Sequence, residues 1–301
     1  MQNCIPEFLY NRLAKQYNEE EIKAIIDGYL SKRPVTLRTN TLKSNVEKIK
    51  EELNKADIKF KEVEWYSDAL ILIDVDESKV RKLDIYKNGE IYLQSLSSMI
   101  PAIILNPLEG ENILDMAAAP GGKTTQMSAL SANKVLITAC EKNKIRADRL
   151  RYNIEKQGAS RINVLEEDAR KLNELFSFDK ILLDSPCSGS GTLNIEDERL
   201  KLYFTEELIE RSAKIQYTLL KKAVNILKPG HEMIYSTCSI LEEENENNIR
   251  KLLEEEKVDV IPIDKNTFKG LKLLTSKIEG TMLIAPDKMY EGFFIAKLRK
   301  K

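Results

Sequence analysis

The chain has 301 residues, of which 32% are charged, and its acids and bases nearly cancel to a net charge of −1. This length can fill one large domain or two modest ones around a full hydrophobic core. No apolar run approaches the roughly 18 residues of a membrane span, and the N-terminus lacks the basic start and apolar stretch of a signal peptide. We therefore expect a cytoplasmic protein without membrane contact.

The first 93 residues predict a small α+β domain. The expected elements are two short helices within 6–33, a helix over 45–56, and strands near 35–40, 60–65, 70–75 and 90–93. The helix over 45–56 is amphipathic, with apolar residues three or four positions apart. We take residues 1–93 as one N-terminal domain.

From residue 94 the pattern changes to strands that alternate with helices. After a helix over 94–105, strands are expected at 112–116, 135–139, 162–165, 181–184, 233–236, 258–262 and 292–297, and helices at 124–131, 143–157, 206–227 and 242–256. Such alternation predicts an α/β domain with a mostly parallel, seven-stranded sheet and helices on both faces. The last strand, rich in Phe and Ile, is expected as an added edge strand.

The four cysteines and the single histidine limit the possible chemistry. Cys4, Cys140, Cys187 and Cys238 include no Cys-x-x-Cys pair, so we expect no metal site and no disulfide framework. His231 alone cannot supply the Ser-His-Asp triads or Cys-His dyads of common hydrolases. Cysteine is often buried, and we interpret Cys4 and Cys140 as packing residues.

Two predicted strands end beside side chains that can react. Asp184 closes an apolar run and Cys187 follows it shortly, while Cys238 follows the strand at 233–236. In open α/β sheets, ligands bind just outside the carboxyl ends of the strands. A thiolate at this edge would be activated by a helix N-terminus, a lysine or its substrate. The sequence therefore predicts a reaction centre that contains both thiols and the carboxylate.

The loop at 115–124, Asp-Met-Ala-Ala-Ala-Pro-Gly-Gly-Lys-Thr, is predicted to hold a cofactor. Its small residues let a ligand approach the backbone, and the N–H groups that open the next helix face that ligand. Glu141 ends the second strand about 20 residues later, where an acid accepts from ribose hydroxyls. Asp168 follows the third strand and can accept from an exocyclic amino group. Ribose and adenine contacts without a phosphate clamp indicate an adenosyl cofactor such as S-adenosylmethionine.

The same loop leaves a second interpretation open. The run from Ala117 to Thr124 resembles a relaxed Walker A sequence, and residues 181–184 could be its Walker B partner. Ala117 stands where a phosphate loop needs glycine, and Pro120 removes one N–H from the cradle. A P-loop NTPase is the first alternative function, and a non-catalytic RNA-binding or assembly factor is the second.

The pair of thiols suits methylation of cytosine at C5. This carbon is a poor nucleophile until a thiolate adds to C6 and makes the ring enamine-like. A carboxyl group that hydrogen-bonds N3 and N4 assists the addition, and a further group helps to release the product. Cys187, Cys238 and Asp184 can fill these roles. Chemistry alone does not decide which thiol is the nucleophile.

Several segments resemble the motifs of the RNA 5-methylcytosine methyltransferases of the Sun (Fmu) family. They are residues 115–124, 184–192 (Asp-Ser-Pro-Cys-Ser-Gly-Ser-Gly-Thr), 235–239 (Tyr-Ser-Thr-Cys-Ser), 38–43 (Arg-Thr-Asn-Thr-Leu-Lys) and 292–296 (Gly-Phe-Phe-Ile-Ala). The resemblance covers nearly the whole chain. It implies a Rossmann-like class I methyltransferase fold over 94–301, S-adenosylmethionine as the cofactor, and rRNA or tRNA as the partner. We expect a monomer.

The resemblance also implies roles for single residues. Cys238 would be the nucleophile, and Cys187 would assist release of the methylated base. The implied cofactor contacts are Ala117, Ala118, Ala119, Pro120, Gly121, Gly122, Lys123, Glu141, Asp168 and Asp184. Lys123 would also tune Asp184 or the thiolates. A near-neutral protein must place positive charge locally to hold phosphates, so we expect Arg38, Asn40 and Lys43 to contact RNA.

Overall fold

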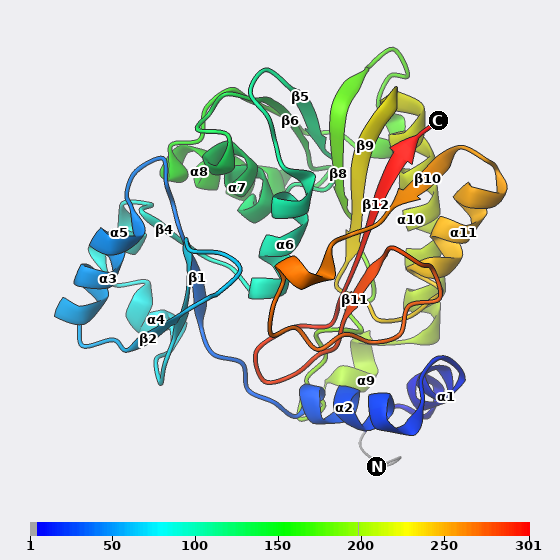
Figure 1. Ribbon diagram of the computed structural model, residues 1–301, viewed down its shortest axis with the longest axis horizontal. Coiled ribbons are helices and arrows are strands. Elements are labelled where there is room, and N and C mark those ends of the chain that lie inside the picture. The colour runs from blue at the N-terminus through cyan, green and yellow to red at the C-terminus, as the bar shows by residue number, and fades with distance from the viewer. Residues whose placement is uncertain (1–4, 198) are drawn as a thin grey trace.

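The computed structural model describes residues 5–197 and 199–301, and Cys4 lies outside them. It shows a body built on a large sheet and a small domain beside it (Figure 1). The small domain has an antiparallel sheet in the order β2-β3-β1-β4. Its elements are β1 (Thr36–Thr39), α3 (Val46–Lys55), β2 (Phe60–Glu62), β3 (Ala69–Leu72), α4 (Glu77–Val80), α5 (Asp84–Lys87) and β4 (Ile91–Leu93). Ile49 and Leu53 of α3 are fully buried against Leu37 and Leu70 of this sheet, as their helical spacing predicts.

The body contains the predicted, mostly parallel sheet. Seven strands run in the order β10-β12-β9-β8-β5-β6-β7, and β11 adds an eighth that pairs with β12. They are β5 (Asn112–Asp115), β6 (Leu136–Cys140), β7 (Ile162–Leu165), β8 (Phe178–Asp184), β9 (Leu227–Thr237), β10 (Val258–Ile261), β11 (Met282–Ile284) and β12 (Phe293–Lys300). The final strand, β12, lies between β9 and β10 and is antiparallel to both, so its predicted edge position is wrong.

Helices cover both faces of this sheet because its strands alternate apolar side chains between two cores. Ile181 and Leu183 of β8 share one core with α10 and α11, whereas Leu182 shares the other with α6, α7 and α8. The body helices are α6 (Leu96–Leu105), α7 (Gly122–Leu130), α8 (Lys144–Gln157), α9 (Leu200–Tyr203), α10 (Glu206–Ile226) and α11 (Glu246–Glu254). Within the described residues, every helix is too short or too polar to span a bilayer.

The first two helices belong to the body rather than to the small domain. Leu9 and Leu13 of α1 (Glu7–Gln16) and Ile25 of α2 (Glu19–Tyr29) are fully buried in the core that contains α10. In Figure 1 both helices lie below the large sheet, away from the small domain. The predicted domain of residues 1–93 therefore combines two helices that pack in the body with the separate small sheet domain. Apolar spacing identified the helices, but it could not show which core they enter.

Arg38 and Asn40, which we expected to contact RNA, are buried between the two parts of the chain. Arg38 is 0% exposed, and its Nη2 donates to Thr125 Oγ1 of α7 at 3.2 Å. The Asn40 amide donates to the main-chain oxygen of Gln157 at the end of α8, at 2.7 Å. These donors hold the small domain on the body. They are not available to RNA in this arrangement.

Lys43 is exposed, but its ammonium group is also used within the protein. Its Nζ donates to the main-chain oxygens of Lys156 at 2.6 Å and of Asn88 at 3.0 Å. An amide or a cation at a strand end can serve phosphate oxygens and peptide oxygens equally well. Sequence alone could not separate these two uses. The expected RNA contact of Arg38 and Asn40 is replaced by an interdomain contact, whereas that of the exposed Lys43 stays a prediction.

We expect Asn40→Ala to lower the free energy of unfolding by about 2–4 kcal/mol. The variant leaves two buried main-chain oxygens, of Gly89 and Gln157, without their donor. Urea denaturation followed by circular dichroism measures the change, with the exposed Asn11→Ala as the matched control. Unchanged stability together with weaker, less salt-dependent RNA binding would contradict the interdomain role.

Candidate active site

The parallel pairing of β8 and β9 brings the two predicted thiols into contact. Asp184 of β8 lies opposite Ser236 of β9, so the loops that follow leave the sheet side by side. Cys187 Sγ and Cys238 Sγ are 3.0 Å apart, and both cysteines are free. The structure thus brings the two predicted strand ends together, and their role as one reaction centre stays a prediction.

Lys123 and Asp184 form an ion pair at the same edge of the sheet. Lys123 Nζ lies 2.7 Å from Asp184 Oδ2 and donates to Ser98 Oγ at 2.6 Å. The other carboxylate oxygen of Asp184 accepts from Ser236 Oγ at 2.7 Å. The lysine nitrogen also lies 5.4 Å from the centre of the Phe293 ring. Both charges are therefore fixed in direction before any ligand binds.

The two thiols have different surroundings. The hydrogen bond with Cys238, burial and the nearby charge of Glu244 all raise the pKa of the Cys187 thiol well above its ordinary value. Cys187 therefore keeps its proton at neutral pH, and its sulfur faces that of Cys238. Cys140, by contrast, is fully buried in the core, where burial raises its pKa to about 12, as a packing residue requires.

Side chains of α8 hydrogen-bond to the main chain of the cofactor loop and fix its conformation. Gly121 has a φ of +108°, a conformation that side chains rarely adopt, and a Cβ there would lie 3.0 Å from Leu150. Arg146 donates to the main-chain oxygen of Ala119 at 2.8 Å, and Asn153 donates to that of Pro120 at 2.8 Å. The loop thus directs two of its oxygens toward α8, and α7 begins at Gly122.

Two cavities adjoin this loop, one on each side of Ala117. The larger, about 220 Å³, is lined by Ala117, Ala118, Ala119, Pro120, Gly122, Lys123, Asp184 and residues of β4 and α6. The smaller, about 50 Å³, is lined by Ala117, Glu141, Asp168 and side chains of α10. Gly121 is the one predicted cofactor contact that lines neither cavity, because it packs toward α8. The structure brings the other nine together.

The acids of the smaller cavity suit a ligand rich in hydroxyl and amino groups. Glu141 is 4% exposed, accepts from the Asn143 main-chain N–H at 2.9 Å and pairs with Arg146 at 3.2 Å. Hydrogen bonds from Arg170 lower the pKa of Asp168 to about 2, so this carboxylate is ionised and can accept. Acceptors at the ends of β6 and β7 fit the ribose and adenine of an adenosyl group.

The Walker A interpretation does not fit the side chains. Thr124, which would bind Mg²⁺ in a phosphate loop, is 0% exposed and donates to Asp115 Oδ2 at 2.7 Å. Lys123, which would reach the phosphates, is occupied by Asp184 and Ser98. Both groups are directed into the protein rather than toward a triphosphate, and a P-loop NTPase is not favoured.

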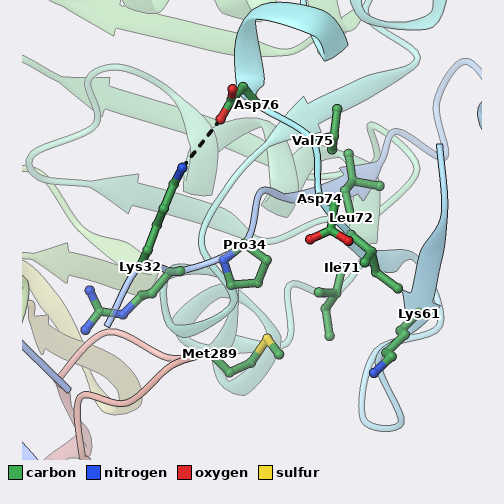
Figure 2. A pocket seen from close by; sticks show the side chains of 11 residues that line it. Lys32, Pro34, Lys61, Ile71, Leu72, Asp74, Val75, Asp76 and Met289 are labelled. Atoms are coloured by element: carbon green, nitrogen blue, oxygen red, sulfur yellow. Dashed lines mark ion pairs between the residues drawn. The ribbon is translucent and has the colours of Figure 1, made fainter. Parts of the chain in front are cut away.

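A further cavity of about 460 Å³ lies away from this centre. It lies at the junction of the small domain and the body, with Pro34, Ile71 and Met289 among its lining residues (Figure 2). The ammonium of Lys32 lies 3.8 Å from the Asp76 carboxylate, and the dashed line marks this ion pair. None of the predicted site residues lines it, and its lining contains three basic side chains and two aspartates. It has neither the thiols nor the charge of a reaction centre.

Several contributors to the site were not identified as such from the sequence. Ser98 and Ser236 orient the Lys123–Asp184 pair, and Phe293 packs beside it. Glu244 lies between the two cysteine loops. The charge of Glu244, six residues beyond Cys238, gave no signal because it stands in a run of acids that looks like a solvated helix start.

The doubly covered parallel sheet and the small-residue loop at its edge define a Rossmann-like methyltransferase fold. The chain belongs to the family described as 16S rRNA methyltransferase RsmB/F, whose model matches residues 102–299. A second model, the ferredoxin-like domain of RsmF/B-like methyltransferases, matches residues 5–75. The resemblance seen in the motifs is thereby confirmed.

Relatives with curated names support the same assignment. The chain is 33% identical over 273 residues to ribosomal RNA small subunit methyltransferase F of Shewanella sp. (strain ANA-3), covering 88% of this chain and 56% of the relative. It is 37% identical over 232 residues to the tRNA (cytosine(72)-C(5))-methyltransferase of Pyrococcus horikoshii, covering 73% and 54%. The chain thus spans a little over half the length of these relatives.

A solved structure extends the likeness to the whole chain. A methyltransferase homolog protein from Pyrococcus horikoshii superimposes with a TM-score of 0.84 at 32% identity, covering 99% of this chain and 96% of that one. Both the small domain and the body are therefore shared.

We expect Asp115→Asn to become more stable, relative to the wild type, as the pH rises from 4 to 8. Burial raises the pKa of Asp115 to about 6, above the roughly 3.9 of an unfolded chain. The native state therefore binds the proton more tightly, and wild-type stability falls as the pH rises through 6. The asparagine does not titrate, and the difference in unfolding free energy should shift by about 1–3 kcal/mol.

Urea denaturation at pH 4.5, 6 and 7.5 measures this shift. The exposed Asp27→Asn serves as the control and should leave the pH profile unchanged. Parallel profiles for Asp115→Asn and the wild type would show that Asp115 is not protonated on this pH scale.

Proposed function

We propose that the chain transfers a methyl group from S-adenosylmethionine to C5 of a cytosine in RNA. The observation that carries the proposal is the pair of free thiols 3.0 Å apart, at the strand edge that also holds Asp184. The adjoining acids of Glu141 and Asp168 support the cofactor. The family description and the cytosine-C5 name of one relative support the reaction.

In the first step of the proposed reaction, one thiol adds to the cytosine ring and the neighbouring charged residues assist. Cys238, as a thiolate, adds to C6 of the cytosine, so that a C–S bond forms and an electron pair moves toward C5 and N3. Asp184 accepts from the N4 amino group, and the Lys123 cation paired with it would stabilise the negative charge that develops on the ring. S-adenosylmethionine, when bound, supplies the methyl group that C5 takes.

Release of the product reverses the addition. The C5 proton leaves to water, its electron pair restores the C5–C6 double bond, and the C6–S bond breaks to return a thiolate on Cys238. The Cys187 sulfur lies 3.0 Å from this sulfur, and its S–H donates a hydrogen bond to the departing thiolate. This division of roles follows the family motifs, and the raised pKa of Cys187 supports it.

The substrate class is rRNA or tRNA, because the names of the relatives divide between the two. All the proposed reacting and cofactor-binding side chains come from one chain, which supports activity as a monomer. We place the reaction in the cytoplasm, where such RNA would be met.

We expect Cys187→Ala to accumulate as a covalent complex with RNA, because Cys238 can add to C6 but leaves slowly. The variant is expressed in the native host, the lysate is denatured, and RNA that stays attached to the recovered protein is sequenced. The attached RNA identifies the substrate and the nucleotide. The double variant Cys187→Ala/Cys238→Ala should carry none.

The other outcomes separate the alternatives. If Cys187→Ala carries no RNA while the wild type methylates cytosine, the assignment of the two thiols is wrong. If the wild type transfers no methyl group, and ATP hydrolysis with Mg²⁺ is found instead, the chain is an NTPase. A cell in which Cys238→Ala has no phenotype would indicate a non-catalytic assembly factor.

A further inference from the structure

Glu244 is a buried carboxylate that contacts the residues next to both cysteines. It is 0% exposed and lies between β9 and α11. Its oxygens accept from Ser188, through the main-chain N–H at 2.7 Å and the hydroxyl at 2.5 Å, and from the Ser239 hydroxyl at 2.6 Å. Ser188 follows Cys187 and Ser239 follows Cys238. One side chain thus joins the two cysteine loops.

The surroundings of Glu244 supply hydrogen bonds but no positive charge among its contacts. A fourth donor is the Gln216 amide of α10 at 3.1 Å, which also donates to the main-chain oxygen of Pro186. Tyr235 of β9 donates to the main-chain oxygen of Glu244. An unpaired buried carboxylate is costly, and these four donors are what make the charge tolerable. The free-energy cost of burying the Glu244 carboxylate indicates a role beyond packing.

A second set of contacts fixes the Cys238 loop against the same segment. The Asn245 amide donates to the Ser239 main-chain oxygen at 2.9 Å and accepts from Thr237 Oγ1 at 2.6 Å. The residues before and after Cys238 are therefore both bound to Asn245. Glu244 is then the only side chain in the described part of the chain that accepts hydrogen bonds from the residues next to both thiols.

We propose that Glu244 is a positioning residue that sets the separation of the two sulfur atoms and keeps the proton on Cys187, so that Cys238 alone reacts as a thiolate. Its negative charge disfavours a second negative charge on the Cys187 sulfur. The inference deepens the proposed function and rests on it for the meaning of the two thiols. Their reactivity can nevertheless be measured without RNA.

The test compares a change of charge with a change of length. Glu244→Gln keeps the shape but removes the charge, and Glu244→Asp keeps the charge but is one methylene too short to reach both serines. Glu246→Gln is the matched control, because Glu246 is equally buried and contacts Ser276 instead of the cysteine loops. Each protein is treated with iodoacetamide between pH 6 and 10, and mass spectrometry of the peptides gives the rate at each cysteine.

In Glu244→Gln we expect the alkylation rate of Cys187 at pH 8 to rise by roughly 5- to 10-fold, because the nearby negative charge that opposes thiolate formation is removed. Cys238 should change by less than about 2-fold. In Glu244→Asp the Cys187 rate should stay near the wild-type value, whereas kcat for methyl transfer falls about 10-fold as the sulfur atoms lose their alignment.

Two results would overturn the proposal. One is an unchanged Cys187 profile in Glu244→Gln, and the other is an equal change in Glu246→Gln, which would indicate general loosening. If Glu244→Gln does not fold, the test rests on Glu244→Asp. A wild-type kcat for methyl transfer in that variant would contradict a positioning role. Absence of methyl transfer in the wild type would instead refute the proposed function, while the alkylation contrast would still test Glu244.

Discussion

The parallel pairing of β8 with β9 is the constraint on which the site depends. Parallel strands end at the same edge of a sheet, so residues 51 positions apart in sequence, Cys187 and Cys238, leave it side by side. The flanking pairs with β5 and β6 add the cofactor loop and Glu141 to the same edge. The two apolar cores hold this register from both faces, because a slip of one residue would exchange every side chain between them.

Two charged groups adjoin the cysteine loops. Lys123 and Asp184 form an ion pair at the sheet edge, and the buried carboxylate of Glu244 accepts hydrogen bonds from the residue that follows each cysteine. The hydrogen bond with Cys238, burial and the charge of Glu244 raise the pKa of the Cys187 thiol well above its ordinary value. The ends of β8 and β9 bring the two sulfur atoms together, and contacts of the loops that follow these strands make their surroundings different.

Much of this arrangement could be predicted from the sequence, and the rest could not, for physical reasons. Apolar runs that stop at turns located most of the strands, and small residues between a strand and a helix located the cofactor loop. The burial of Arg38 and Asn40 was missed, because a donor at a strand end looks the same whether it serves phosphate or a neighbouring domain. Glu244 was missed because partners distant in sequence, such as Ser188, make it a buried residue.

The most direct test of the thiol mechanism measures the loss of the hydrogen atom on C5 of cytosine. RNA labelled with tritium at C5 of cytosine is incubated with the wild-type protein and S-adenosylmethionine, and tritium released to water is counted beside methyl groups incorporated. Addition of the Cys238 thiolate to C6 predicts one tritium released for each methyl group, and neither event with Cys238→Ala. Methyl transfer without tritium release would place the methyl group on another atom and contradict the thiol mechanism.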